Sequence, residues 1–319
     1  MKEIRFGVFL DVFAQPLTYS DFKDLAIESE RLEYESVWMC DHFMRGRGPI
    51  LECLTTLSAI SSLTKKIRLG SLVLCNSYRN PSILAKAAAT LDVISNGRLE
   101  FGIGAGWAEN EYLAYGIPFP KPSIRIAQVR EGIEIVKRMW TEETASYEGR
   151  YFRIKDAVCE PKPLQKPHPP ITIGGSGEKL MLRIVAEYAD RSNWHETAEM
   201  CRHKLKVLEK HCSSIGRDSQ EIEKSVDMVV SISENEQELT ENLKKLYSSR
   251  KQTVSFKEWL KVVKARDIMG IPSECLERIK EYVDIGITYF MLRFQDFPSK
   301  KGMRLFAEEV MKRIQQASP

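Results

Sequence analysis

The sequence predicts an α/β protein whose eight parallel strands close into a (β/α)8 TIM barrel. Eight short apolar segments alternate with amphipathic helical segments along the 319 residues. The apolar segments lack polar alternation, which is typical of parallel strands buried on both faces. Right-handed crossovers between such strands close into a barrel, and the chain length suits one barrel. An open, doubly wound sheet is the alternative, and the eight regular units favour the barrel.

The first four strand–helix units are expected in the first 140 residues. The strands are predicted at residues 4–10, 37–40, 67–75 and 99–104, and the helices at residues 20–32, 51–63, 81–94 and 123–140. Pro81 stands in the first turn of the third helix, where its missing N–H costs nothing. Asn96 and Gly97 predict a left-handed cap at the end of that helix.

The regular alternation is interrupted once and then resumes. Residues 147–152 flank a Gly turn and predict a surface hairpin, and the Pro-rich residues 162–170 can form neither a helix nor a central strand. Further strands are predicted at residues 171–173, 191–194, 226–232 and 288–294, and helices at 178–188, 198–214, 236–247 and 301–314. We therefore expect a single domain, residues 1–319, with a hairpin insertion at about 144–170 and a helical insertion at about 249–272, before the last strand.

Composition argues against several classes of protein. The 47 basic and 44 acidic residues give a net charge of +3 without a basic run, so nucleic acid binding is not expected. The chain lacks an apolar run of about 18 residues and a signal-peptide core, so we expect no membrane span and a cytoplasmic location. Seven cysteines without a C-x-x-C pair predict reduced, mostly buried thiols. The spacing of His, Cys and carboxylate residues suggests no metal site.

Polar and small residues follow two of the predicted strands. Asp41 and His42 follow the second strand, and the run from Gly102 to Gly106 ends the fourth. The carboxyl ends of parallel strands meet at one rim, where such folds carry out chemistry. The small residues would let a flat ring approach the rim, and the G-x-G-x-G pattern lacks the other marks of a dinucleotide fingerprint. The sequence therefore predicts an enzyme with a large planar cofactor.

Several short motifs occur in a characteristic order. They are Asp41-His42, Arg68-Leu69-Gly70, Arg79-Asn80-Pro81, residues 87–92, Ser95-Asn96-Gly97-Arg98, residues 102–107, residues 147–152, Pro161-Lys162-Pro163 and Ile173-Gly174-Gly175. This set resembles the bacterial luciferase-like superfamily. It is most similar to the branch that uses the deazaflavin coenzyme F420, which includes methylenetetrahydromethanopterin reductase and F420-dependent glucose-6-phosphate dehydrogenase. The resemblance covers residues 4–195, and beyond them it rests on strand order and on Gly286-Ile287-Thr288.

The resemblance implies two catalytic residues, His42 and Glu52. Hydride transfer at C5 of the deazaflavin leaves a proton to be moved on the substrate, and a His with a pKa of about 6.5 can move it near neutral pH. The alternative is that His42 only caps its strand. Glu52 at the start of the second helix is a candidate proton donor, although the helix dipole alone also favours an acidic residue there.

The resemblance also implies a set of cofactor contacts. Leu72-Val73 matches a dipeptide that is joined by a cis peptide bond and backs the ring in relatives, and an ordinary core strand is the alternative. The loop at residues 174–177 would bind a phosphate arm through free N–H groups, unless it is a plain tight turn. The implied cofactor-binding residues are Asp41, Leu72, Val73, Asn76, Gly106, Trp107, Gly174, Gly175, Ser176, Gly177 and Trp194. His195 follows Trp194 at the end of the same predicted strand and is a candidate to line the ring or substrate pocket.

One position departs from the dehydrogenase pattern. A catalytic Glu directly follows the Gly run in the sugar-phosphate dehydrogenase relatives, whereas this chain has Trp107. This departure argues against sugar-phosphate oxidation. Glu109 and Glu111 lie close by. One alternative is that they substitute for the missing Glu, and the expectation is that they are solvated carboxylates at the start of a helix. Cys75 is a candidate reactive thiol only if a cation such as Arg79 lowers its pKa.

The leading expectation is an F420-dependent oxidoreductase that transfers a hydride between C5 of the deazaflavin and a small organic substrate. One alternative is an FMN-dependent monooxygenase on the same barrel, which would use reduced flavin and oxygen. Another is a flavin-binding barrel that has lost catalysis. The resemblance also implies a homodimer through the second and third helices.

Overall fold

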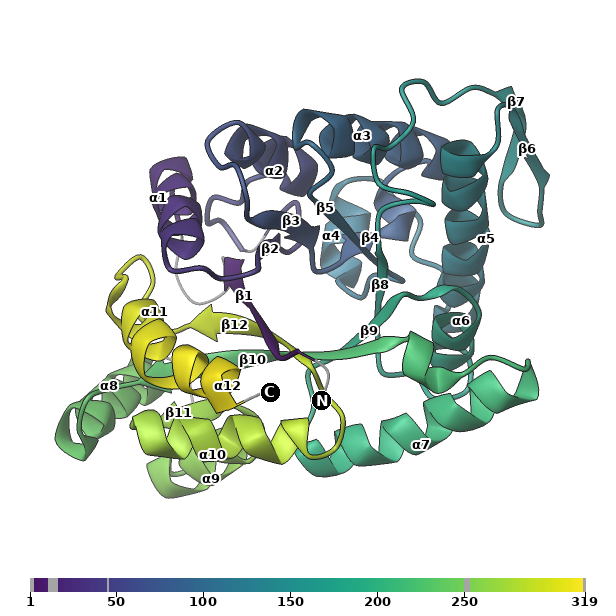
Figure 1. Cartoon of the computed structure of the whole chain (residues 1–319). Coiled ribbons are helices and arrows are strands. Elements are labelled where there is room, and N and C mark those ends of the chain that lie inside the picture. The colour runs from purple at the N-terminus through teal and green to yellow at the C-terminus, as the bar shows by residue number, and fades with distance from the viewer. Residues whose placement is uncertain (1–2, 11–16, 45, 250–252, 318–319) are drawn as a thin grey trace.

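Eight parallel strands form a closed barrel in the computed structural model, which describes residues 3–10, 17–44, 46–249 and 253–317. The barrel strands are β1 (Arg5–Leu10), β2 (Ser36–Met39), β3 (Arg68–Ser71), β5 (Leu99–Gly104), β8 (Ile171–Gly174), β9 (Arg191–Trp194), β10 (Glu223–Ile232) and β12 (Tyr289–Phe294). They pair in this order, and pairing of β12 with β1 closes the ring. Figure 1 shows the helices arranged outside this ring. The predicted (β/α)8 barrel is confirmed.

Several helices begin where the sequence supplies capping groups. Thr18 and Asp21 form a capping box at the start of the first helix, and the Asn80 side chain accepts from the Ser82 N–H ahead of the third. The helices are α1 (Tyr19–Arg31), α2 (Cys53–Ser61), α3 (Pro81–Ile94), α4 (Glu109–Ala114), α5 (Pro122–Thr141), α6 (Met181–Tyr188), α7 (Ala198–Ser214), α8 (Glu236–Ser249), α9 (Phe256–Arg266), α10 (Pro272–Val283), α11 (Lys301–Phe306) and α12 (Lys312–Ala317). Within the described ranges, no helix is long and apolar enough to span a membrane.

Both insertions are present. An antiparallel hairpin, β6 (Ala145–Glu148) and β7 (Arg153–Ala157), projects beside α5 (Figure 1). The second insertion differs from its prediction, because it contains a strand, β11 (Ile268–Gly270), as well as α9. This three-residue strand pairs with β10 outside the barrel, and it is too short for a pattern of apolar residues to reveal. Residues 250–252 of the predicted insertion lie outside the described residues.

The predicted strand at residues 67–75 is divided into β3 and β4 (Leu74–Cys75). The Leu72–Val73 peptide bond between them is cis. A Cβ atom on Gly102 would lie 1.9 Å from the Ser71 carbonyl oxygen, and one on Gly104 would lie 2.6 Å from Val73 Cγ2. Gly102 and Gly104 therefore make room for the neighbouring strand. Gly104, Ala105 and Gly106 also line a cavity at the rim, and the approach of a ring there stays a prediction.

Buried ion pairs fill the amino-terminal end of the barrel. Arg191 donates from Nη1 to Glu100 at 2.7 Å and from Nε to Glu223 at 2.6 Å. Arg68 donates to the other oxygen of Glu100. Burial alone would raise the pKa of Glu100, but the two guanidinium groups outweigh it and lower that pKa. The charges at this end are thus paired with one another, and the opposite end of the barrel is open to a ligand.

Candidate active site

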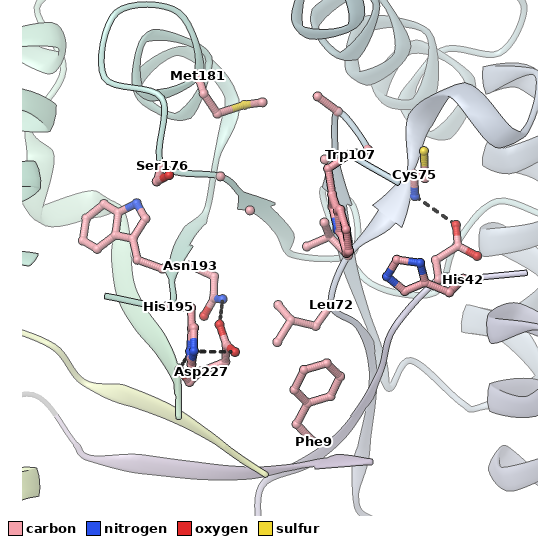
Figure 2. Close-up of a pocket in the computed structure, with 18 of the residues that line it drawn as sticks. Phe9, His42, Leu72, Cys75, Trp107, Ser176, Met181, Asn193, His195 and Asp227 are labelled. Carbon is pink, nitrogen blue, oxygen red and sulfur yellow. Dashed lines mark hydrogen bonds and ion pairs between the residues drawn. The ribbon is translucent and has the colours of Figure 1, made fainter. Parts of the chain in front are cut away.

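A cavity of about 470 Å³ lies at the carboxyl-terminal rim of the barrel (Figure 2). This volume is in the range of pockets that hold small molecules and cofactors. The predicted site residues that line it are Asp41, His42, Leu72, Val73, Gly106, Trp107, Gly174, Gly175, Ser176 and Trp194. Glu52, Asn76 and Gly177 lie outside this lining. The structure thus brings most of the predicted residues together around one cavity.

His42 forms a buried pair with Glu111. Its Nδ1 atom lies 2.9 Å from one Glu111 carboxylate oxygen and 3.0 Å from the other. Nδ1 must carry the proton, because a carboxylate only accepts hydrogen bonds. The Tyr78 hydroxyl and the Met44 N–H also donate to Glu111. Together these contacts fix the orientation of the imidazole at the edge of the cavity.

The expectation that Glu111 is solvated is wrong. Glu111 is 2% exposed, whereas Glu109 on the same short helix α4 is exposed. The helix follows directly on β5 and turns its Glu111 side inward over the rim. The signal in the sequence was the large aromatic residue Tyr112 next to Glu111, and the structure shows that it is buried as well.

Asp41 connects the rim of β2 to β4. Its carboxylate accepts from the Cys75 N–H at 2.9 Å and, through both oxygens, from Arg79 at 2.7 and 2.8 Å. This two-point contact is the strong form of an Arg–carboxylate pair. Asp41 therefore holds the backbone after the cis peptide bond in place.

Glu52 is the residue before α2, and its carboxylate accepts from the Thr55 N–H at 2.7 Å. It also pairs with Arg79. Burial would raise the pKa of Glu52, but the Thr55 hydrogen bonds and the Arg79 charge lower it overall. A carboxylate held ionised in this way caps the helix, and the arrangement favours that role over proton donation.

Two polar groups near the cavity have local partners. The Asn76 side chain is buried and donates to the Gln128 carbonyl at 3.0 Å, so it packs against α5. The Cys75 sulfur lies 2.9 Å from the Tyr112 hydroxyl oxygen. Burial raises the pKa of Cys75 to about 11, so this thiol stays protonated near neutral pH. All seven cysteines are buried and free of disulfides.

The loop after β8 is held from behind by a buried lysine. Lys204 on α7 is 3% exposed, and its Nζ donates to the Ser176 carbonyl at 3.0 Å and lies 3.5 Å from Glu196. Gly175 has φ +138°, a conformation that favours glycine. Helix α6 begins only at Met181, so Gly177 is not at a helix start as the predicted helix at 178–188 implied.

Asn193, His195 and Asp227 line the opposite wall of the cavity. Arg293 does not line the cavity but bonds Asp227, and we call these four residues the polar wall. Asp227 accepts from Asn193 at 3.1 Å and from Arg293 at 2.8 Å. His195 Nδ1 lies 2.7 Å from the Asp227 carbonyl oxygen and 3.3 Å from its carboxylate. Burial lowers the pKa of His195, but Asp227 outweighs it and raises that pKa overall.

The polar wall was largely missed by sequence reasoning, which considered only His195 as a lining residue. Asp227 and Arg293 lie within strands β10 and β12 among apolar residues, where a charged side chain signals a buried partner. Beside the wall, Trp194 is 2% exposed and its buried Nε1 atom has no hydrogen-bond partner. Such a donor at a cavity is suited to an acceptor on a ligand.

The sequence model of the family described as luciferase-like monooxygenase matches residues 4–289. The chain belongs to this family. An F420-dependent glucose-6-phosphate dehydrogenase from Amycolatopsis mediterranei is 25% identical, over 92% of this chain and 94% of the relative.

Solved structures share the fold of this luciferase-like protein. An F420-dependent secondary alcohol dehydrogenase, in complex with an F420-acetone adduct, has a TM-score of 0.82 at 21% identity, covering 97% of this chain and 98% of that one. The monooxygenase RslO1 from Streptomyces bottropensis has a TM-score of 0.81 at 21% identity, covering 98% of this chain and all of the other. The fold is thus common to dehydrogenases and monooxygenases.

Proposed function

We propose that this luciferase-like protein is an F420-dependent oxidoreductase that transfers a hydride between C5 of the deazaflavin and a small organic substrate. The observation that carries the proposal is the His42–Glu111 pair at the edge of the cavity that Leu72 and Val73 also line. Curated F420-dependent relatives that align along nearly the whole chain support the choice of cofactor.

The residues around the cavity fit a deazaflavin nucleotide. Leu72 and Val73 would back the ring, and the loop at Gly174–Ser176, with the Lys204 cation behind it, would hold the phosphate arm. The buried Trp194 N–H would find an acceptor on the ligand. When bound, the deazaflavin supplies or accepts the hydride at C5.

His42 moves the proton that accompanies the hydride. Glu111 holds Nδ1 of His42, so the other ring nitrogen of His42, Nε2, exchanges a proton with the reacting oxygen of the substrate. Tyr78 donates to Glu111, and burial, with the Glu111 contact, raises the pKa of Tyr78 well above its usual value. The phenol therefore stays protonated and keeps Glu111 in position.

We propose an uncharged substrate, because two features disfavour a sugar phosphate. Trp107 stands where the dehydrogenase relatives have a Glu, and its ring packs edge-on against His42 with centroids 5.5 Å apart. In the described part of the chain, the cavity lining contains no Lys or Arg to bind a phosphate. The cytoplasmic location and the homodimer through α2 and α3 stay predictions.

The proposal is tested by incubating the protein with reduced F420 and a panel of small aldehydes and ketones, with and without air. We expect reduced F420 to be oxidised with at least one carbonyl compound, at the same rate with and without air, because a deazaflavin does not activate oxygen usefully. Oxygen-dependent turnover that requires reduced FMN would instead establish the monooxygenase alternative. A protein that binds neither cofactor would be a non-catalytic barrel.

A further inference from the structure

The cavity has two unlike walls (Figure 2). One wall, at the ends of β4 and β5, offers mainly backbone groups, at Cys75 and Gly104–Gly106. The other is the polar wall on β9, β10 and β12, in which Asn193 is 5% and Asp227 9% exposed. Buried charges are kept only where partners or ligands repay the loss of water. The proposed hydride transfer uses His42 and leaves the polar wall without a role.

We propose that the polar wall selects F420 over FMN by binding the hydroxyl group on the deazaflavin ring. F420 has this hydroxyl at C8, where FMN has a methyl group. The inference rests on the proposed function, because it concerns how the same cofactor, F420, is oriented in the cavity.

The order of the strands around the barrel supports this orientation. His42 follows β2, and the phosphate-binding loop follows β8, so C5 and the phosphate arm would point to different sides of the rim. The long axis of the ring then runs between the two remaining sides, which are β4–β5 and β10–β12. The pyrimidine end of the ring matches the backbone groups at Gly104–Gly106, and the hydroxyl end would meet the polar wall.

The chemistry of the polar wall suits an acidic hydroxyl. The hydroxyl ionises into the conjugated ring, and its anion would lie near the imidazole of His195, which lines the cavity and is itself in contact with the guanidinium of Arg293. Asp227 is already bonded by Asn193, His195 and Arg293, so it orients these donors. Glu196, the other carboxylate nearby, is paired with Lys204. A methyl group at the same place can accept no hydrogen bond from the wall, and a site built around such a hydrogen bond discriminates strongly against a ligand that lacks it.

The decisive experiment measures dissociation constants of F420, FMN and 5-deaza-FMN by fluorescence quenching, for the wild type and for His195→Leu. The probe 5-deaza-FMN has carbon at position 5 but retains the ring methyl groups. We expect His195→Leu to weaken F420 binding about tenfold to a hundredfold and to leave FMN and 5-deaza-FMN unchanged. The matched control is His203→Leu, because His203 lies on α7 with 53% of its side chain exposed.

A second measurement needs no variant. We expect F420 bound to the wild type to show more of the visible band of the ionised hydroxyl than free F420 does at the same slightly acidic pH. Unchanged F420 affinity in His195→Leu, or equal losses for F420 and FMN, would overturn the inference while wild-type turnover with F420 leaves the proposed function standing. Wild-type binding of FMN alone would overturn both.

Discussion

Replacing Glu111 with Gln is expected to lower kcat for F420-dependent turnover about 100- to 10,000-fold, while the dissociation constant of F420 changes little. Glu111 accepts the Nδ1–H of His42, and a positioned acid/base contributes a factor of this size. The amide cannot offer the same pair of acceptor oxygens to His42, Tyr78 and Met44, so the imidazole would lose its fixed tautomer and orientation. Steady-state kinetics with the substrate found in the carbonyl panel measures the effect.

Two comparisons separate this positioning role from general damage. Glu109→Gln on the same short helix should leave kcat unchanged, because Glu109 is exposed. In a His42→Ala background, Glu111→Gln should lower kcat only a little further, because the two residues act as one unit. Full additivity of the two losses, or a normal kcat in Glu111→Gln, would remove His42–Glu111 from the mechanism.

The second large effect concerns stability. Arg191→Met is expected to lower the free energy of unfolding by about 3–5 kcal/mol, because it takes one of its two guanidinium partners from the buried Glu100 carboxylate. The Arg191 side chain is 4% exposed and also contacts Glu223. Urea denaturation followed by circular dichroism provides the measurement. Arg183→Met is the matched control, because Arg183 pairs with Glu187 at the surface and has 61% of its side chain exposed. This replacement should lower the free energy of unfolding by less than about 1 kcal/mol.

The stability lost in Arg191→Met should also depend on pH. The pKa of Glu100 is lower in the folded than in the unfolded protein, so its ion pairs stabilise the fold above the unfolded pKa. That stabilisation disappears as the pH falls through the folded pKa. The difference between wild type and Arg191→Met should therefore be largest near neutral pH and shrink in acid. A difference that grows in acid, or none at neutral pH, would contradict the role given to this ion pair.

The barrel was predictable because its strands are short apolar runs separated by helices with recognisable starts, such as Asn80-Pro81 before α3. The division of residues 67–75 into β3 and β4 was implied only by resemblance, since both halves are equally apolar. The three-residue strand β11 escaped prediction because it adds to β10 through backbone pairing and leaves little trace in side-chain pattern.

The site residues that lie directly after a predicted strand, such as Asp41 and His42, could be found from the sequence. The partners of these residues were harder to find, because they come from elsewhere in the chain. Glu111 lies 69 positions after His42 along the sequence, and only the fold brings the two together. Asp227 and Arg293 were hidden in the same way, since each reads as an isolated charge within a strand until β10 and β12 are seen side by side.

The cavity at the barrel rim is proposed to bind a deazaflavin and not a flavin. This proposal is tested most directly by titrating the wild-type protein with F420 and, separately, with FMN, and by following quenching of cofactor fluorescence. We expect saturable binding of F420, with FMN bound at least tenfold more weakly, because the ring methyl groups of FMN can accept no hydrogen bond from the polar wall. Tight binding of FMN without binding of F420 would contradict it.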